Sequence, residues 1–400
     1  MEKAFDIMVA GHLCIDIIPR FPDTGASSIA EIMRPGKLVN VEEAMISTGG
    51  PVSNTGRNMK VLGNRVCFCA RVGGDELGKM TIAMLEKSGN AEGVRGVPGA
   101  ASSYTVVVAP PGIDRIFLHN PGTNNTFGSD DLNPELIAGC RHFHFGYPPL
   151  MQRIYESDGE ELRRVFQIAR VAGATTSCDM ALPDPDSPSG RVNWRAILEK
   201  ILPFIDIYLP SLEETFFMLE PDEFLKMKRD HNDADLIDIL TPEDYSRLAD
   251  QVLSLGAKMV SLKSGHRGFY LKTASKEAFN SMGAARPGDP DNWSSRELWA
   301  PAFQVEKFGS ATGSGDSSIA GLLTGFLRGH SIEQSLRYAT CLGWQNVQVF
   351  DAVSGVRPWE ETAAMAAEKH PLIEVKISSG DWKWSDEYEI WSGPGDPLSR

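Results

Sequence analysis

The chain alternates short apolar runs with longer amphipathic segments, and this alternation is the strongest constraint on its fold. Residues 159–174 and 242–257 have helical spacing, and each segment ends in Gly-Ala. Strand–helix alternation predicts a mostly parallel sheet with helices on both faces, whose ligands lie beyond the carboxyl ends of the strands. The runs that we interpret as buried strands are IMVAG (7–11), VCFCARVG (66–73), HFHFG (142–146), TTSCDM (175–180), IDIYLP (205–210) and MVSLKSG (259–265).

Two stretches interrupt the alternation. Residues 17–48 and 102–119 contain no good helical pattern, and 103–119 has the form of a β-hairpin that turns at Pro110-Pro111-Gly112. Extra strands inserted between strand–helix units predict a small sheet over one end of the main sheet, which would be a candidate lid. The alternative is an ordinary edge hairpin. We interpret four further segments, at 183–193, 220–240, 274–299 and 376–400, as surface elaborations.

Composition excludes some classes of protein. The 400 residues have 42% hydrophobic content and a net charge of −14, and they contain no basic tract, which argues against a nucleic-acid surface. The N-terminal run is interrupted by Asp6, His12 and Asp16, so we expect neither a signal peptide nor a membrane span, and a cytoplasmic protein. The six scattered cysteines predict buried free thiols.

One glycine-rich stretch, 309-GSATGSGDSSIAGLLTGFLRG-329, leads into a helical pattern just after Asp316. The amides of Gly313, Ser314, Gly315 and Asp316 would then be free donors at the positive end of a helix, which favours an anion. The loop lacks the lysine of a Walker motif and lies too late in the chain for a dinucleotide fingerprint. We interpret it as a phosphoryl site in which Asp316 accepts a proton from an attacking hydroxyl. The alternative is a tight turn with Asp316 as the helix cap.

The early segment 48-TGGPVSNTGRNMKVLG-63 supplies candidate substrate-binding residues. Gly49 and Gly50 would let a small polar substrate approach the backbone, and the Asn54 amide would bind its hydroxyls. Asp16 follows the first strand, where a carboxylate could chelate a sugar diol. For each of these residues the alternative is a structural role, as a glycine turn, an internally bonded amide or a loop acid.

The order of these motifs resembles the ribokinase/PfkB family of carbohydrate kinases, from about residue 5 to about residue 370. The resemblance includes the early Gly-Gly-x-x-x-Asn, the turn 73-GGDELG-78, 211-SLEE-214, 263-KSGHRG-268 and the late Gly-x-Gly-Asp. It implies a three-layer α/β/α fold with a mostly parallel central sheet and a small β lid. We expect a kinase domain over 1–375, with lid strands from about 17–48 and 102–119, and an aromatic and acidic extension over 376–400.

The resemblance also implies roles for single residues in transfer of phosphate from ATP to a hydroxymethyl group of a sugar or sugar-like molecule. Asp316 matches the general base, and Gly313, Ser314 and Gly315 match the anion hole. Asp16, Gly49, Gly50 and Asn54 match the sugar-binding positions. Glu214 matches the acid that orients Mg²⁺, and Gly265, Arg267 and Gly268 match the loop that contacts the nucleotide. The lid would close over the sugar, and in this family it often mediates dimers.

The sequence departs from the family pattern in three places. Ser310 replaces the first Asp of Asp-Thr-x-Gly-Ala-Gly-Asp, which puts activation by a monovalent cation in doubt. Ser211 replaces the Asn of Asn-x-x-Glu, which weakens the inferred magnesium site. HFHFGYPP stands where ribokinase has a sugar-contacting Glu, so ribose itself is not favoured.

Two other functions remain open at this point. A nucleoside kinase of the same fold would need an apolar slot for the base, for which Phe117, Phe145 and Tyr147 are candidates. A non-catalytic sugar-binding or regulatory protein would be compatible with the changes at Ser211 and Ser310. We interpret His142 and His144, which alternate on a strand, as structural residues rather than as metal ligands.

Overall fold

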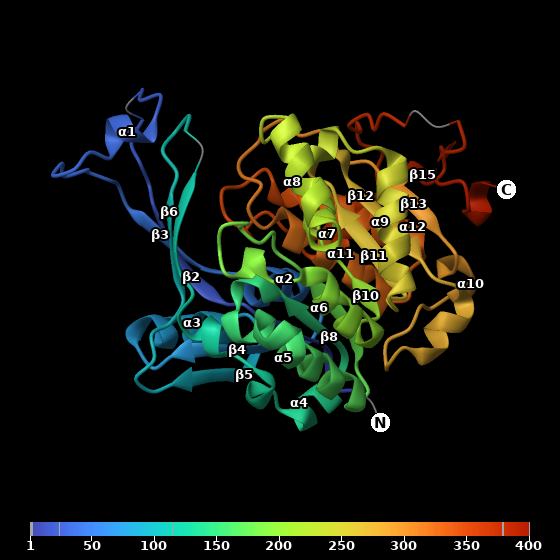
Figure 1. Cartoon of the computed structure of the whole chain (residues 1–400), viewed down its shortest axis with the longest axis horizontal. Helices are drawn as coiled ribbons and strands as arrows, with labels where there is room; N and C mark the ends of the chain where they lie inside the picture. Colours follow the sequence, from blue (N-terminus) through green and yellow to red (C-terminus); the bar gives the residue numbers. More distant parts are fainter. Residues whose placement is uncertain (1–2, 24, 114, 378–379, 400) are drawn as a thin grey trace.

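The computed structural model describes residues 3–23, 25–113, 115–377 and 380–399. Its body is built on an eleven-stranded sheet in the order β14-β15-β13-β12-β11-β10-β9-β8-β1-β4-β5 (Figure 1). Every pairing from β11 through β5 is parallel, as the strand–helix alternation predicts. The parallel strands are β1 (Phe5–Gly11), β4 (Val66–Gly73), β5 (Asn90–Val97), β8 (Cys140–Gly146), β9 (Thr175–Asp179), β10 (Ile207–Tyr208) and β11 (Met259–Lys263).

Four antiparallel strands extend the sheet beyond β11. They are β12 (Phe269–Thr273), β13 (Glu297–Ala300), β15 (Ile390–Ser392) and β14 (Lys383–Ser385). The interpretation of 274–299 as a surface elaboration was wrong for its C-terminal part, because Trp293, Leu298 and Trp299 are buried. A strand with neighbours on both sides is usually recognised by a continuous apolar run. Here Arg296 and Glu297 interrupt that run, so the strand was not predicted.

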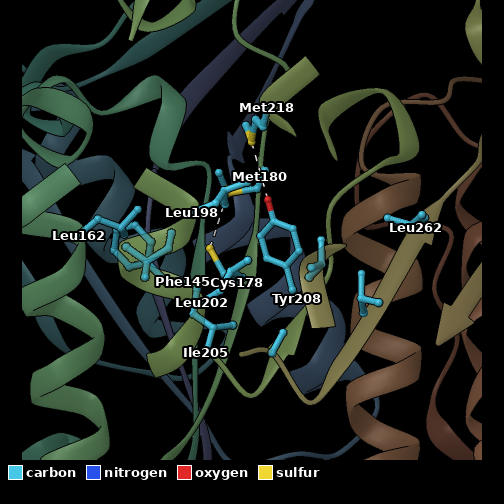
Figure 2. Close-up of a cluster of buried hydrophobic side chains, with 14 of the residues drawn as sticks. Phe145, Leu162, Cys178, Met180, Leu198, Leu202, Ile205, Tyr208, Met218 and Leu262 are labelled. Atoms are coloured by element: carbon cyan, nitrogen blue, oxygen red, sulfur yellow. Dashed lines mark hydrogen bonds between the residues drawn. The ribbon is translucent and has the colours of Figure 1, made fainter. Parts of the chain in front are cut away.

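Helices cover both faces of the sheet, so the three-layer α/β/α prediction is confirmed. Two separate apolar cores fill the two interfaces, and Figure 2 shows part of the first, around Phe145, Cys178 and Tyr208. The first face is covered by α4 (Pro134–Ala138), α5 (Gln152–Val171), α6 (Trp194–Ile201), α7 (Leu212–Leu219), α8 (Pro221–Asp230) and α9 (Pro242–Ser254). The second is covered by α2 (Pro51–Val61), α3 (Glu76–Glu86), α10 (Pro290–Trp293), α11 (Ser314–Leu327), α12 (Ile332–Asn346) and α13 (Trp359–Ala367).

A second, four-stranded sheet projects from one end of the body (Figure 1). Its order is β3-β2-β6-β7, from β2 (Cys14–Pro19), β3 (Ala44–Gly49), β6 (Tyr104–Val108) and β7 (Ile116–Asn120). These strands come from the two stretches for which the sequence predicts lid strands. We call this sheet the lid. The short helix α1 (Ile29–Ile32) also lies in the first stretch, where no helix was expected.

The remaining sequence expectations have mixed outcomes. All six cysteines are free and buried, as predicted. In the segment 220–240, which we interpreted as a surface elaboration, α8 occupies the first half, and Phe224 is its buried residue. In the tail, Trp382 packs against Tyr270 and Trp299. Among the described residues, no helix is both long and apolar enough to cross a membrane.

Candidate active site

The start of α11 is an open helix end. Gly313 is the residue before the helix, with φ 75° and ψ 0°, and no side chain caps the first turn. A Cβ at Gly313 would lie 2.4 Å from the Cβ of Ala352, so glycine is needed there for two reasons. Within the described residues the amides of Gly315 and Asp316 have no acceptor. Two aligned donors at a positive helix end make a site for an anion.

Ser314 does not contribute a free donor. Its amide donates to the carbonyl oxygen of Ala311 at 3.2 Å, and its hydroxyl donates to the same oxygen at 2.9 Å. The expectation of free amides throughout 313–316 is therefore wrong for Ser314, because this residue closes the turn that presents Gly315 and Asp316.

Asp316 is the junction between α11 and α2. Its side chain is 2% exposed and accepts three hydrogen bonds. The Asn54 amide donates to Oδ2 at 3.0 Å, the Thr55 hydroxyl donates to Oδ1 at 3.2 Å, and the Tyr147 hydroxyl donates to Oδ2 at 3.1 Å. Asp316 and Asn54, which the sequence analysis assigned separately as base and as substrate-binding residue, are therefore in direct contact. A substrate hydroxyl would reach the carboxylate by replacing one of these donors.

Burial raises the pKa of Asp316 above its ordinary value, while its hydrogen bonds and the nearby Lys263 ammonium lower it in part. A raised pKa makes the carboxylate a stronger base. The hydrogen-bond donors and the ammonium favour the ionised carboxylate, which is the form that a general base requires.

A buried charge cluster faces the α11 turn. Lys263 ends β11 and forms an ion pair with Asp179, which ends β9 and is fully buried. A Cβ at Gly315 would lie 3.3 Å from Cδ and 3.7 Å from Nζ of Lys263, so the lysine side chain runs past the free amides. Burial raises the pKa of Asp179 to about 8 and raises that of Glu214, whereas the lysine opposes both shifts. Three carboxylates, Asp316 included, share one ammonium here.

Glu214 caps its own helix. Its carboxylate accepts from the Ser211 amide at 2.6 Å, and the Ser211 hydroxyl accepts from the Glu214 amide at 3.2 Å. This capping box explains how serine replaces the family's asparagine without loss of the helix start. Within the described residues, no group of three or more His, Cys, Asp or Glu could hold a metal alone. Several carboxylates are buried here, and Oδ2 of Asp179 has no hydrogen-bond partner among the described residues. These oxygens suit Mg²⁺ that is also bound by phosphate oxygens.

The predicted substrate residues form a second close-packed group at the base of the lid. Asp16 lies on β2 opposite Ser47 of β3, and a Cβ at Gly49 would lie 2.2 Å from its Oδ2. Burial raises the pKa of Asp16 to about 6. Gly50 has φ 82°, and a Cβ there would lie 2.6 Å from the carbonyl oxygen and from Nδ1 of His12. Both glycines are thus required by close approach.

In the predicted nucleotide loop, the side chain of Arg267 makes contacts within the protein, whereas a contact with the nucleotide was expected. This side chain is buried, donates to the carbonyl oxygens of Ile237 and Leu240, and stacks on the ring of Trp299. It holds the segment after α8 against the body. Gly268, at φ 89°, would place a Cβ 2.1 Å from the carbonyl oxygen of Ala300. Gly265 starts the turn next to Lys263 and so lies beside the charge cluster.

Ser310 is engaged by the lid. Arg115, at the start of β7, donates to its hydroxyl at 3.0 Å. Nearby, the Asn346 amide donates to the carbonyl oxygen of Thr312 at 2.8 Å. Protein donors therefore occupy oxygens of the loop in which the family pattern has its first Asp.

Two alternative interpretations can be compared with the geometry. Phe145 lies in the first core and Phe117 is exposed on the lid, so these rings do not form one slot with Tyr147. His142 and His144 are fully buried and share the Ser177 hydroxyl at 2.7 and 2.8 Å, which is a structural arrangement.

Sequence reasoning missed Lys263, Asp179 and Thr55 and gave Tyr147 another role. Lys263, Asp179 and Tyr147 lie at the carboxyl ends of parallel strands or just after them, where ligands of such sheets bind. A polar residue that ends a buried strand was the available signal. Thr55 had no such signal, because a single threonine within a helix is unremarkable.

Comparison with known proteins identifies relatives of this chain. The pfkB family of carbohydrate kinases matches residues 4–359. A probable fructokinase of Arabidopsis thaliana is 28% identical over 225 residues, which cover 56% of this chain and 64% of that protein. An uncharacterised sugar kinase of Archaeoglobus fulgidus is 23% identical, over 74% of this chain and 96% of that protein. The chain spans less than two-thirds of the length of the Arabidopsis fructokinase that it matches.

Solved structures show the same fold. Ribokinase of Arabidopsis thaliana, complexed with ribose and ATP, superposes with a TM-score of 0.67 at 18% identity, covering 92% of this chain and all of that one. A putative ribokinase II of E. coli, in complex with ATP and Mg²⁺, gives 0.65 at 20% identity, over 90% of this chain and 98% of that one. At these identities the likeness establishes the three-layer architecture.

Proposed function

The chain belongs to the pfkB family of carbohydrate kinases, and on that premise we propose that it transfers phosphate from ATP to a hydroxymethyl group of a sugar or sugar-like molecule. The observation that carries this proposal is the junction at Asp316. One buried carboxylate lies next to two free amides of α11 and within hydrogen-bonding reach of α2. Base and anion site are thus fixed to the same helix turn.

In the proposed reaction the substrate hydroxyl replaces the Tyr147 hydroxyl on Asp316. The oxygen of the substrate attacks the γ-phosphorus of ATP, its proton passes to Asp316, and the bond to the β-phosphate oxygen breaks to release ADP. The amides of Gly315 and Asp316 and the ammonium of Lys263 stabilise the charge on the transferred phosphoryl group. Mg²⁺, held through Glu214 and the phosphates, would supply further charge neutralisation.

The substrate side uses the residues at the base of the lid. Asp16 would chelate a diol, and Asn54 would bind a hydroxyl next to the reacting one. Because Asp16 has a pKa raised to about 6, its carboxylate is ionised at neutral pH. The relatives named fructokinases lead us to place fructose first among the acceptors to test. Lid closure would exclude water and limit ATP hydrolysis.

We also propose that two copies associate through the lid. Ile46, Phe117 and Leu118 are large apolar residues on β3 and β7, and each is at least 45% exposed. Light scattering should find a dimer that Phe117→Ser with Leu118→Ser converts to a monomer.

The test of the proposed activity is ADP release with Mg²⁺ and ATP, over a panel of sugars and a parallel panel of nucleosides. We expect turnover with a ketose or related sugar. Turnover confined to nucleosides would assign the site to a nucleoside kinase. Sugar binding without ADP release, measured by thermal shift, would identify a binding protein that has kept the fold.

A further inference from the structure

A second cavity lies outside the candidate active site, behind α2. It has a volume of about 480 Å³ and is bounded by β3, the outer side of α2, the end of α3 and the segment 351–356. It shares no residue with the site around Asp316. We propose that this cavity binds a small molecule that carries a phosphate group.

The charges of the cavity favour an anion. Arg57, Lys60, Lys87 and Asp351 are its charged lining residues, so three cations less one carboxylate leave two positive charges. This excess occurs in a chain whose net charge is −14. A phosphate ester carries about −1.5 to −2 at pH 7, which matches the excess closely. A neutral or cationic ligand would leave it uncompensated.

The cations of the cavity make no close contact with a carboxylate of the described residues. Among the described residues, Arg57, Lys60 and Lys87 form no ion pair, although cations elsewhere, such as Lys226, pair with neighbouring acids. Arg57 is half-buried, and its guanidinium donates to the Thr48 hydroxyl at 3.2 Å. Burial disfavours the charge of Arg57, and the attraction of Asp351 offsets this only in part, so a bound anion would stabilise the guanidinium further.

The carboxylate in the wall is directed to its own turn. Asp351 accepts from the amides of Val353 and Ser354 at 2.8 and 2.7 Å and from the Ser354 hydroxyl at 2.5 Å. Its hydrogen bonds are made within the segment 351–354, and its charge attracts Arg57 without a close ion pair. The rest of the lining consists of the hydroxyl residues Ser47, Ser88 and Ser354 and the apolar residues Met45, Ile46, Val61, Val353 and Val356. The cavity can therefore take an ester with a small carbon skeleton.

The cavity adjoins the catalytic turn through Ala352, which follows Asp351 in the cavity wall. Ala352, next to Asp351, packs against Gly313. A Cβ added at Gly313 would lie only 2.4 Å from the Cβ of Ala352. The Asn58 amide, on the other side, donates to the Ala352 carbonyl oxygen at 3.4 Å and to the Ser317 hydroxyl at 2.9 Å. An anion that fixes the segment 351–354 would thus fix the start of α11. This coupling to catalysis rests on the proposed function, whereas the binding itself does not.

Calorimetric titration with inorganic phosphate tests the binding without any need for turnover. The double variant Arg57→Gln/Lys60→Gln removes two of the cations. We expect its phosphate affinity to fall by at least about tenfold, which corresponds to about 1.4 kcal/mol, because charge-assisted hydrogen bonds to the phosphate are lost. The matched control Arg229→Gln/Lys369→Gln removes two exposed cations elsewhere and should bind as the parent does.

Two additions make the result decisive. Lys60→Gln/Lys87→Gln changes exposed side chains only, so it should keep the fold and still weaken phosphate binding. Fructose 6-phosphate, titrated beside phosphate and fructose, separates an ester ligand from free phosphate. If phosphate bound instead at the start of α11, both variants would bind it as the parent does. Titrations that superimpose for the parent and both variants, including the case in which none binds, would overturn the proposal. An acceptor screen without turnover would leave this result unaffected.

Discussion

Helices α2 and α11 begin alike and are used differently. Each follows a glycine with positive φ, 82° at Gly50 and 75° at Gly313, and neither has a side-chain cap. At the start of α2, Pro51 has no N–H and the amide of Val52 donates to the carbonyl oxygen of His12 at 3.4 Å, which leaves the amide of Ser53. The first turn of α11 keeps two amides free. Helix α11 therefore offers more free donors than helix α2 does.

The difference shows what turns a helix start into a site. A glycine and a positive helix end occur in both helices, so these features alone do not define an anion site. What distinguishes α11 is Lys263 beside its free amides and Asp316 on the same turn. Helix α2 serves instead as a support, because it holds Asn54 and Thr55 against Asp316.

The largest effect on this comparison should come from Lys263→Met. Loss of the ammonium beside the amides should reduce kcat by about 10²- to 10³-fold, as expected for one preorganised donor to a developing charge. The variant would also leave the buried Asp179 without its ammonium partner, which should lower the free energy of unfolding. Lys263→Met/Asp179→Asn should recover stability, measured by denaturant unfolding, but not turnover. Recovery of both would assign Lys263 a purely structural role.

The two helix starts should respond in opposite ways to an added methyl group. Gly315→Ala meets only the flexible chain of Lys263 at 3.3 Å, so stability should stay as it is while kcat falls by about 10- to 100-fold from displaced geometry. Gly50→Ala meets the His12 backbone at 2.6 Å in a left-handed conformation, and should lose about 1–3 kcal/mol. Thermal melting curves and kcat, measured for both variants, test this expectation. Equal effects of both substitutions on activity and stability would remove the distinction.

A smaller effect is expected at Tyr147. Its hydroxyl lowers the pKa of Asp316, so Tyr147→Phe should raise that pKa further. Only the ionised carboxylate accepts a proton, so activity is complete above this pKa and is lost as pH falls through it. The acid limb of kcat/KM should therefore move to higher pH, with little change on the plateau. An unmoved acid limb would show that Tyr147 does not act on Asp316.

The smallest effect should be that of potassium. Because Arg115 and Asn346 already donate to Ser310 and Thr312, we expect the same turnover with and without K⁺. Sodium and choline salts at equal ionic strength serve as controls. Strong activation by K⁺ alone would contradict this expectation.

Local patterns predicted much of the fold and part of the site. The buried strands and the hairpin at 103–119 follow from apolar periodicity, and the uncapped start of α11 follows from its glycine turn. Strand β13 was missed because charged residues interrupt its run. Lys263 and Asp179 were missed because their role arises only when β9 and β11 lie on either side of β10. Such neighbours depend on sheet order, which no local pattern contains.

The most direct test of the central claim is Asp316→Asn, measured with the best acceptor from the panel. We expect kcat to fall by about 10²- to 10⁴-fold, because the general base is lost. The affinity for ATP, measured by direct titration, should stay unchanged. Turnover close to that of the parent chain would contradict it.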